Sequence, residues 1–190
     1  RPQRGLQQAD VVYGCPVEGG ITRFMAIFSD TIPETVMPVR SARHYYLRIQ
    51  QEWDCPYIHY GGTESRYANS KRSSPISCYD EKADHITVNV DGIMGKYDKY
   101  FQRMSSRKAP HNVEAFLQDI QNELGYSPEP LPWVFGDGGY TGDTVSEVSI
   151  PFYGGRGYVS YRYDPQTDKF IRYSKGEEFI AEETGSAVTV

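Results

Sequence analysis

The feature that most constrains the fold is a helical pattern that begins directly after an extended segment. From residue 42 onward the apolar side chains follow the spacing i, i+3, i+4, i+7 and i+11 of one helix face. These side chains are Ala42, Tyr45, Tyr46, Ile49 and Trp53. Ser41 stands just before them and is a preferred N-cap residue, so we expect a helix that starts at this serine. A short apolar run at 57–60 and Gly61-Gly62 follow, which together predict a strand–helix–strand unit.

Groups that bind anions are crowded at the N-terminal end of this helix. The first N–H groups of a helix lack partners, and the helix dipole favours negative charge there. Guanidinium groups add donors that match carboxylate and phosphate. If the two flanking strands are parallel, the Gly-Gly loop faces the same edge of the sheet as this helix start, and His59 stands at a strand end, where ligands gather in open sheets. His111 precedes the second predicted helix, with Arg107 close in sequence. The predicted ligand-binding residues are Arg40, Ser41, Arg43, His44, His59, Gly61, Gly62, His111 and Asn112.

A second helical pattern and a strand-rich C-terminal segment complete the predicted fold. Val113, Phe116, Leu117, Ile120 and Leu124 repeat the helical spacing, with Asn112 as the expected N-cap and Gly125 as the expected stop. Residues 127–132 contain three prolines and are expected to be a linker. Strands are then expected at 145–150, 158–163, 169–173 and 177–181, with turn residues at 164–168.

We therefore predict an α+β fold in two parts. The N-terminal part, residues 1–126, has a mixed sheet with two amphipathic helices and carries the site. The C-terminal part, residues 133–190, is an antiparallel β-meander.

Charge and cysteine content exclude several classes of protein. The net charge of −5 argues against a nucleic-acid-binding protein. Cys15, Cys55 and Cys78 form no C-x-x-C pair, which excludes a zinc ribbon, and no cofactor motif is present. No apolar stretch is long enough to cross a membrane. A local basic cluster is most simply a solvated helix face; its residues are Lys96, Lys99, Arg103, Arg107 and Lys108.

Several segments together resemble the YerB-like family of bacterial lipoproteins. They include RPQRGL at 1–6, VEGGITRF at 17–24, PVRSAR at 38–43, HYGG at 59–62 and APHN at 109–112. The segments ADVVY at 9–13, YRYD at 161–164 and RY at 172–173 extend the likeness over nearly the whole chain. The resemblance implies an exported protein held at the outer face of the membrane by a lipid, with the lipid-bearing cysteine upstream of Arg1. The function of that family is not known, so the resemblance supplies no catalytic residue.

Three functions are open at this point. The first is binding of an anionic envelope polymer or a small anion at Arg40 and Arg43. The second is hydrolysis, with His59 or His111 as general base and Glu18 as a further catalytic candidate. A metal or a base would require His44, His59 and His111 to converge with an acidic residue. The third is a structural or protein-interaction module, in which both arginines pair internally with carboxylates; the candidates are Glu18, Asp30 and Glu34.

Overall fold

The computed structural model of the chain contains two compact units. It describes residues 2–17, 19, 21–62, 88–93, 95–127, 132–134, 136, 142–152 and 157–190. Arg1–Pro33 and Ser127–Val190 make up the first unit, here called the terminal unit, and Glu34–Tyr126 make up the second, the central unit. This grouping places the first residues of the chain with the C-terminal strands, whereas the sequence placed them with residues up to 126. The division into parts at 1–126 and 133–190 stays a prediction.

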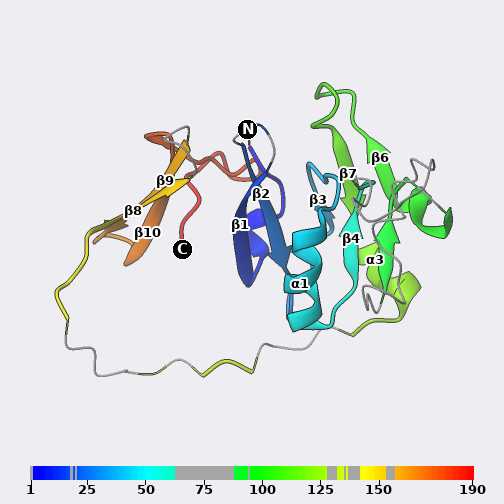
Figure 1. Ribbon diagram of the computed structural model, residues 1–190, viewed down its shortest axis with the longest axis horizontal. Coiled ribbons are helices and arrows are strands. Elements are labelled where there is room, and N and C mark those ends of the chain that lie inside the picture. Colours follow the sequence, from blue (N-terminus) through cyan, green and yellow to red (C-terminus); the bar gives the residue numbers. More distant parts are fainter. Residues whose placement is uncertain are drawn as a thin grey trace. The chain divides into compact units, whose positions relative to one another are not determined.

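The terminal unit is built from a hairpin and a meander. In the meander the strands lie in the antiparallel order β11-β10-β9-β8, as predicted. Figure 1 labels β8, β9 and β10 of this sheet. The N-terminal segment is hydrogen-bonded to the segment that follows the meander: Gln3 O accepts the Glu182 N–H at 3.0 Å. The rings of Phe24 and Phe179 also meet edge to face at 5.5 Å. The elements are η1 (Leu6–Gln8), β1 (Val11–Val17), β2 (Ile21–Ile27), β8 (Glu147–Phe152), β9 (Gly157–Asp164), β10 (Lys169–Ser174) and β11 (Glu177–Glu178).

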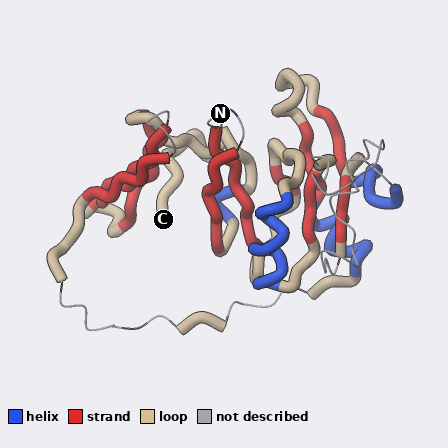
Figure 2. Tube along the Cα trace, viewed as in Figure 1, coloured by secondary structure: helices blue, strands red, loops and turns tan. Residues whose placement is uncertain are grey.

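The central unit holds both predicted helices and two small sheets. One sheet is antiparallel with the order β3-β7-β6, and the other is the parallel pair β4-β5. Figure 2 shows these strands in red with the helices in blue. The elements are β3 (Thr35–Val36), α1 (His44–Trp53), β4 (Tyr57–His59), β5 (Asn89–Asp91), η4 (Gly95–Tyr100), β6 (Phe101–Arg103), β7 (Val113–Phe116) and α3 (Leu117–Leu124). The α+β class is confirmed, with parallel and antiparallel pairing in separate sheets.

Side chains from both helices and both sheets form the core of the central unit. The buried apolar residues are Met37, Ala42, Tyr46, Leu47, Tyr57, Val90, Val113, Ala115, Leu117 and Ile120. One polar side chain, Gln50, is fully buried on α1, and its Nε2 donates to Cys55 O at 2.7 Å. This bond ties the end of the helix to the connection that leads into β4, and so fixes where β4 begins.

Helix α1 begins later than the sequence predicts. Its N-cap is Arg43 and its first residue is His44, so the prediction of Ser41 as N-cap is wrong. The reason is a bond to another segment: Ala42 N–H donates to Gly61 O at 2.8 Å, and Ala42 forms a parallel bridge with Gly62. This pairing keeps the backbone extended through Ala42, and the helix starts only when the pairing ends.

The second helix also begins later than predicted. Its N-cap is Phe116, and the residues that directly follow Asn112 form β7, so the prediction of Asn112 as N-cap is wrong. β7 is the central strand of its sheet, and backbone pairing on both sides overrides the local helical spacing. The predicted stop is confirmed, since Gly125 adopts a left-handed conformation with φ 62°.

Candidate functional site

Three segments of the central unit meet at the C-terminal end of β4. The Tyr60 N–H donates to Arg40 O at 3.1 Å, and the Gly92 N–H donates to His59 O at 2.9 Å. The bond from Ala42 to Gly61 completes the contact on the side of α1. The segment before α1 and the Gly-Gly loop therefore lie side by side, and the end of β5 lies on the opposite side of β4.

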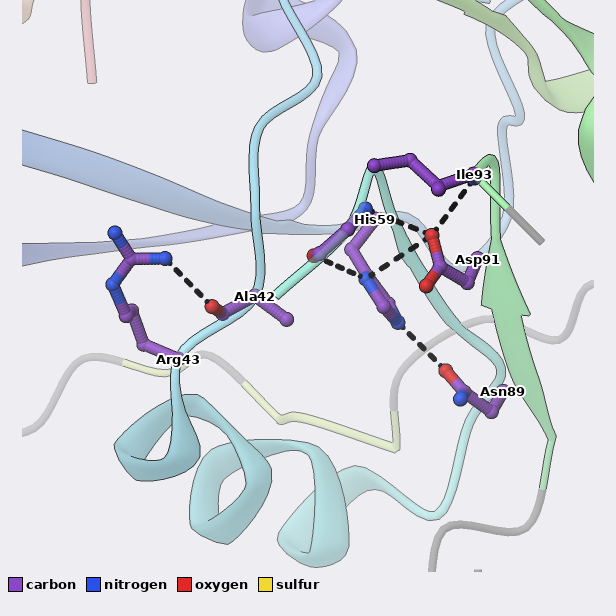
Figure 3. A network of polar contacts seen from close by, with 7 residues as sticks. Ala42, Arg43, His59, Asn89, Asp91 and Ile93 are labelled. Atoms are coloured by element: carbon purple, nitrogen blue, oxygen red, sulfur yellow. Dashed lines mark hydrogen bonds and ion pairs between the residues drawn. The ribbon is translucent and has the colours of Figure 1, made fainter. Parts of the chain in front are cut away.

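A buried polar network holds these segments together (Figure 3). The Oδ1 atom of Asp91 accepts the N–H groups of Gly61 at 2.8 Å and Ile93 at 2.9 Å. His59 lies against the same carboxylate, with 3.9 Å between its Nδ1 and Asp91 Oδ1. His59 Nδ1 is also 2.8 Å from Gly61 O, and its Nε2 is 2.7 Å from Asn89 Oδ1. The network therefore orders both the backbone of Gly61 and the turn after β5.

His59 is placed as a structural residue rather than as a base at a surface. Its relative exposure is 2%, and both of its ring nitrogens have hydrogen-bond partners. A general base must reach the proton that it removes, and this ring faces protein groups on both sides. The hydrolase hypothesis for His59 therefore receives no support from its surroundings.

Gly61 is required by this network. Its φ is +70°, and a Cβ at this position would lie 2.5 Å from Ile93 Cδ1. The left-handed backbone favours glycine here, whereas the Cδ1 atom is the movable end of an exposed side chain. The HYGG segment therefore supplies a turn that lets three chain segments approach one another.

Arg40 and His111, two of the predicted site residues, lie in contact. The Arg40 Nη1 group donates to Pro110 O and lies 3.1 Å from His111 Nδ1. A guanidinium has no acceptor, so His111 Nδ1 accepts this bond and the ring hydrogen sits on Nε2. Arg40 and His111 are both partly exposed. The pair thus places a guanidinium beside an imidazole ring at a partly exposed position of the central unit.

A second arginine reaches the next residue along the chain. Arg103 Nη1 donates to Asn112 Oδ1 at 2.9 Å, and its guanidinium lies 5.0 Å from the centre of the Tyr60 ring. Within the described part of the chain, both of these partners are neutral, and Arg103 is exposed. Asn112 is itself fixed, because its Nδ2 donates to Met104 O at 3.3 Å. Arg40 and Arg103 therefore hold the consecutive residues His111 and Asn112.

The other predicted site residues are distributed differently. Arg43 folds back so that its Nη1 donates to Ala42 O at 2.9 Å, and Figure 3 shows it apart from the His59 network. It does not cap α1 with its side chain. Ser41 and Gly62 are partly exposed, close to the place where the three segments meet at the C-terminal end of β4. Glu18 and the side chain of His44 lie outside what the structure describes.

Sequence reasoning missed three residues of this region. Asp91 and Asn89 come from the end of β5, and Tyr60 follows β4; none was predicted as a site residue. The parallel pairing of β4 with β5, which brings them together, joins segments about 30 residues apart, as in the pair His59–Asn89. A carboxylate after a strand, Asp91, was the only local signal.

The described residues include two free thiols and no cluster of metal-binding side chains. In the part of the chain that the structure describes, no three His, Cys, Asp or Glu side chains gather as a metal site requires. Cys15 and Cys55 are free thiols, and burial raises the pKa of each. Cys78 lies outside the described residues.

None of the described helices is both long enough and apolar enough to cross a membrane.

Comparison with known proteins decides the family. A family model described as "Protein of unknown function (DUF3048) N-terminal domain" matches residues 1–127. The chain belongs to this family. Over its full length it is 30% identical to a Bacillus subtilis (strain 168) protein named "Putative lipoprotein YerB", of which it covers 56%. The crystal structure of the YerB protein from Bacillus subtilis matches the whole chain with a TM-score of 0.74 at 30% identity.

These matches confirm the resemblance to YerB-like lipoproteins and the α+β fold. The chain spans 56% of the curated relative and 61% of the solved chain, so both relatives are longer than the part matched here.

Proposed function

We propose that this chain is the extracytoplasmic part of a lipid-anchored protein and that it binds an anionic ligand of the cell envelope. The location rests on the relative, which is named a lipoprotein. The ligand class rests on side chains: the guanidinium groups of Arg40 and Arg103 both bond to the short segment 110–112, which includes His111. Arg40, Arg103 and His111 are here called the arginine–histidine site. The lipid anchor itself lies upstream of Arg1 in this proposal.

The observation that carries the proposal is the way in which Arg103 is held. Within the described residues its partners are an amide oxygen and a tyrosine ring, which orient the guanidinium without cancelling its charge. Two of the contacts that hold Arg40 are likewise to neutral groups, the carbonyl of Pro110 and the ring nitrogen of His111. Oriented guanidinium groups lose less rotamer freedom when they bind a carboxylate or a phosphate. For Arg103, such an arrangement favours a binding role over the role of an internal strut.

This proposal moves the site away from the start of α1. The helix begins at His44, and Arg43 bonds to Ala42 O, so the donors gather around the 110–112 segment instead. The anion would then be bound by side chains, with the helix dipole as a minor contribution, because that contribution falls off within the first turn.

The test is thermal unfolding in the presence of inorganic phosphate or citrate. At about 100 times its dissociation constant, a ligand stabilises the native state by about 2.7 kcal/mol. We expect the parent chain to be stabilised, and the substitution Arg40→Ala to remove this effect. Arg48→Ala is the matched control, since Arg48 is an exposed arginine of the central unit that belongs to α1 and not to the arginine–histidine site. The proposal fails if neither anion stabilises the parent, or if Arg48→Ala removes the effect as fully as Arg40→Ala.

A further inference from the structure

The basic cluster singled out in the sequence remains unused by the arginine–histidine site except for Arg103. Residues 95–108 carry five basic side chains and one acidic side chain, Asp98, so this segment has a charge of 5 − 1 = +4. The whole chain has a charge of −5. This local excess runs from η4 through β6 and ends at the residues that contact the site. A positive segment of this kind on an acidic protein attracts anions locally.

The first part of the segment presents two ammonium groups to solvent. Lys96 and Lys99 are three residues apart in η4, and a 3-10 helix has about three residues per turn, so both lie on one face. Their Nζ atoms lie 3.8 and 3.6 Å from the carboxylate of Glu123. The two side chains are 63% and 58% exposed. Glu123 and the exposed Asp98, which lies between the two lysines in η4, balance these two ammonium charges, so the positive excess of the segment comes from Arg103, Arg107 and Lys108.

An aromatic ring accompanies each of three cations along the segment. Lys96 Nζ lies 5.0 Å from the centre of the Tyr97 ring, and Lys99 Nζ lies 4.8 Å from that of Tyr100. Arg103 repeats the arrangement on Tyr60. Cation–π contacts restrain long side chains while their charge stays available to an anion. The chain thus displays a series of restrained cations, here called the cationic track, consisting of Lys96, Lys99 and Arg103.

The length of the cationic track determines which ligand can use all of it. At about 2 Å per residue, the backbone positions of Lys96 and Lys99 are about 6 Å apart along η4. Arg103 is four residues after Lys99, so at the rise of a strand the backbone positions of these two residues are at most about 13 Å apart. A single phosphate or carboxylate group is too small to contact both ends of the cationic track. A flexible chain with repeated anionic groups can contact every cation at once.

We infer that the ligand is a flexible polymer with repeated phosphate or carboxylate groups. One anionic group binds at the arginine–histidine site and the following groups bind along Lys99 and Lys96. This inference rests on the proposed function, since Arg103 belongs to both the site and the track. The track adds affinity through several weak contacts on one ligand, which is an effect of effective concentration.

The test compares inorganic phosphate with long-chain polyphosphate and with poly-L-glutamate, by isothermal titration calorimetry on the whole chain. We expect at least one polymer to bind more than tenfold tighter, per binding site, than phosphate does. The double substitution Lys96→Ala with Lys99→Ala should weaken polymer binding about tenfold and leave phosphate binding unchanged. It should also lower the slope of log affinity against log salt concentration by about two, roughly one for each lysine. The two polymers distinguish a phosphate ligand from a carboxylate ligand.

The control is Lys169→Ala with Lys175→Ala, which removes the same charge from exposed positions of the terminal unit. This control should bind the polymer as the parent does. If phosphate binds through Arg40 but neither polymer binds tighter, the inference fails and the proposed function stands. If Arg40→Ala affects neither ligand, the proposed function fails and this inference with it. Equal polymer loss in both double variants, or tighter binding to anionic lipid vesicles than to either polymer, also overturns the inference.

Discussion

Replacing Asp91 by alanine is expected to destabilise the central unit by about 2 kcal/mol. The Oδ1 atom of this carboxylate accepts the amides of Gly61 at 2.8 Å and Ile93 at 2.9 Å. Gly61 is buried, so its amide would lose its partner without gaining water, which costs about 1–3 kcal/mol. Ile93 is exposed at the surface, and its amide can bind water instead, so its loss adds little.

The substitution Asp91→Asn separates hydrogen bonding from charge. Asparagine keeps an oxygen at the Oδ1 position. In the described residues the buried Oδ2 atom has no hydrogen-bond partner, so replacing it with an amide group breaks no bond. We expect Asp91→Asn to stay within about 1 kcal/mol of the parent, since the two amide acceptances are preserved.

Urea unfolding followed by tryptophan fluorescence measures both variants, because Trp53 belongs to the central unit. With a denaturant slope of about 2 kcal/mol per molar urea, Asp91→Ala should lower the midpoint by about 1 M. An unchanged midpoint in the alanine variant would refute the role of the two amide bonds. An equal loss in Asp91→Asn would show instead that the charge beside His59 is what stabilises the network.

Two further substitutions test the turn geometry and a surface pair. Gly61→Ala and Gly125→Ala should each destabilise the chain by about 1–2 kcal/mol in thermal unfolding, because both positions have positive φ and the added Cβ at Gly61 meets only the movable Cδ1 end of the exposed Ile93 side chain. No loss in Gly61→Ala would contradict the left-handed turn. The hydrogen bond from Tyr100 lowers the pKa of Glu123, so its contribution is present above the unfolded pKa of about 4.3 and is lost as the pH falls through the lower folded pKa. The Tm difference between the parent and Glu123→Gln should therefore shrink as the pH falls below about 4.3 and disappear below the lowered folded pKa, and a difference independent of pH would argue against this pair.

Local spacing was sufficient to find the helices but not their starts. The stripe at Tyr46 and its neighbours marks α1 correctly, since burial of one helix face depends on spacing along the chain alone. The start depends on Ala42, whose amide bonds to Gly61 from a segment that is distant in sequence. Val113 belongs to a helical pattern and yet lies in β7, because strand pairing on both sides decides its conformation. Pairing with distant segments cannot be predicted from the local spacing of apolar residues.

The same limit applies to the site. The sequence identified Arg40 and His111 as site residues, and the structure brings them into contact. It assigned Asn112 to a helix cap, whereas Asn112 holds Arg103 through the pairing of β6 with β7. It offered His59 as a base because it could not show that a parallel strand, β5, would bury the ring. The sequence allowed candidate residues to be chosen by type, but it did not show which residues would become their partners through sheet pairing.

The most direct test of the account is the NMR spectrum of the histidine rings during titration with inorganic phosphate. His111 should show a hydrogen on Nε2 and an unprotonated Nδ1, because Arg40 donates to Nδ1. We expect the ring signals of His111 to move with saturation as phosphate binds, those of the buried His59 to stay, and Arg40→Ala to abolish the movement. If phosphate binds while the signals of His111 remain unchanged, the anion lies elsewhere and the arginine–histidine site is refuted.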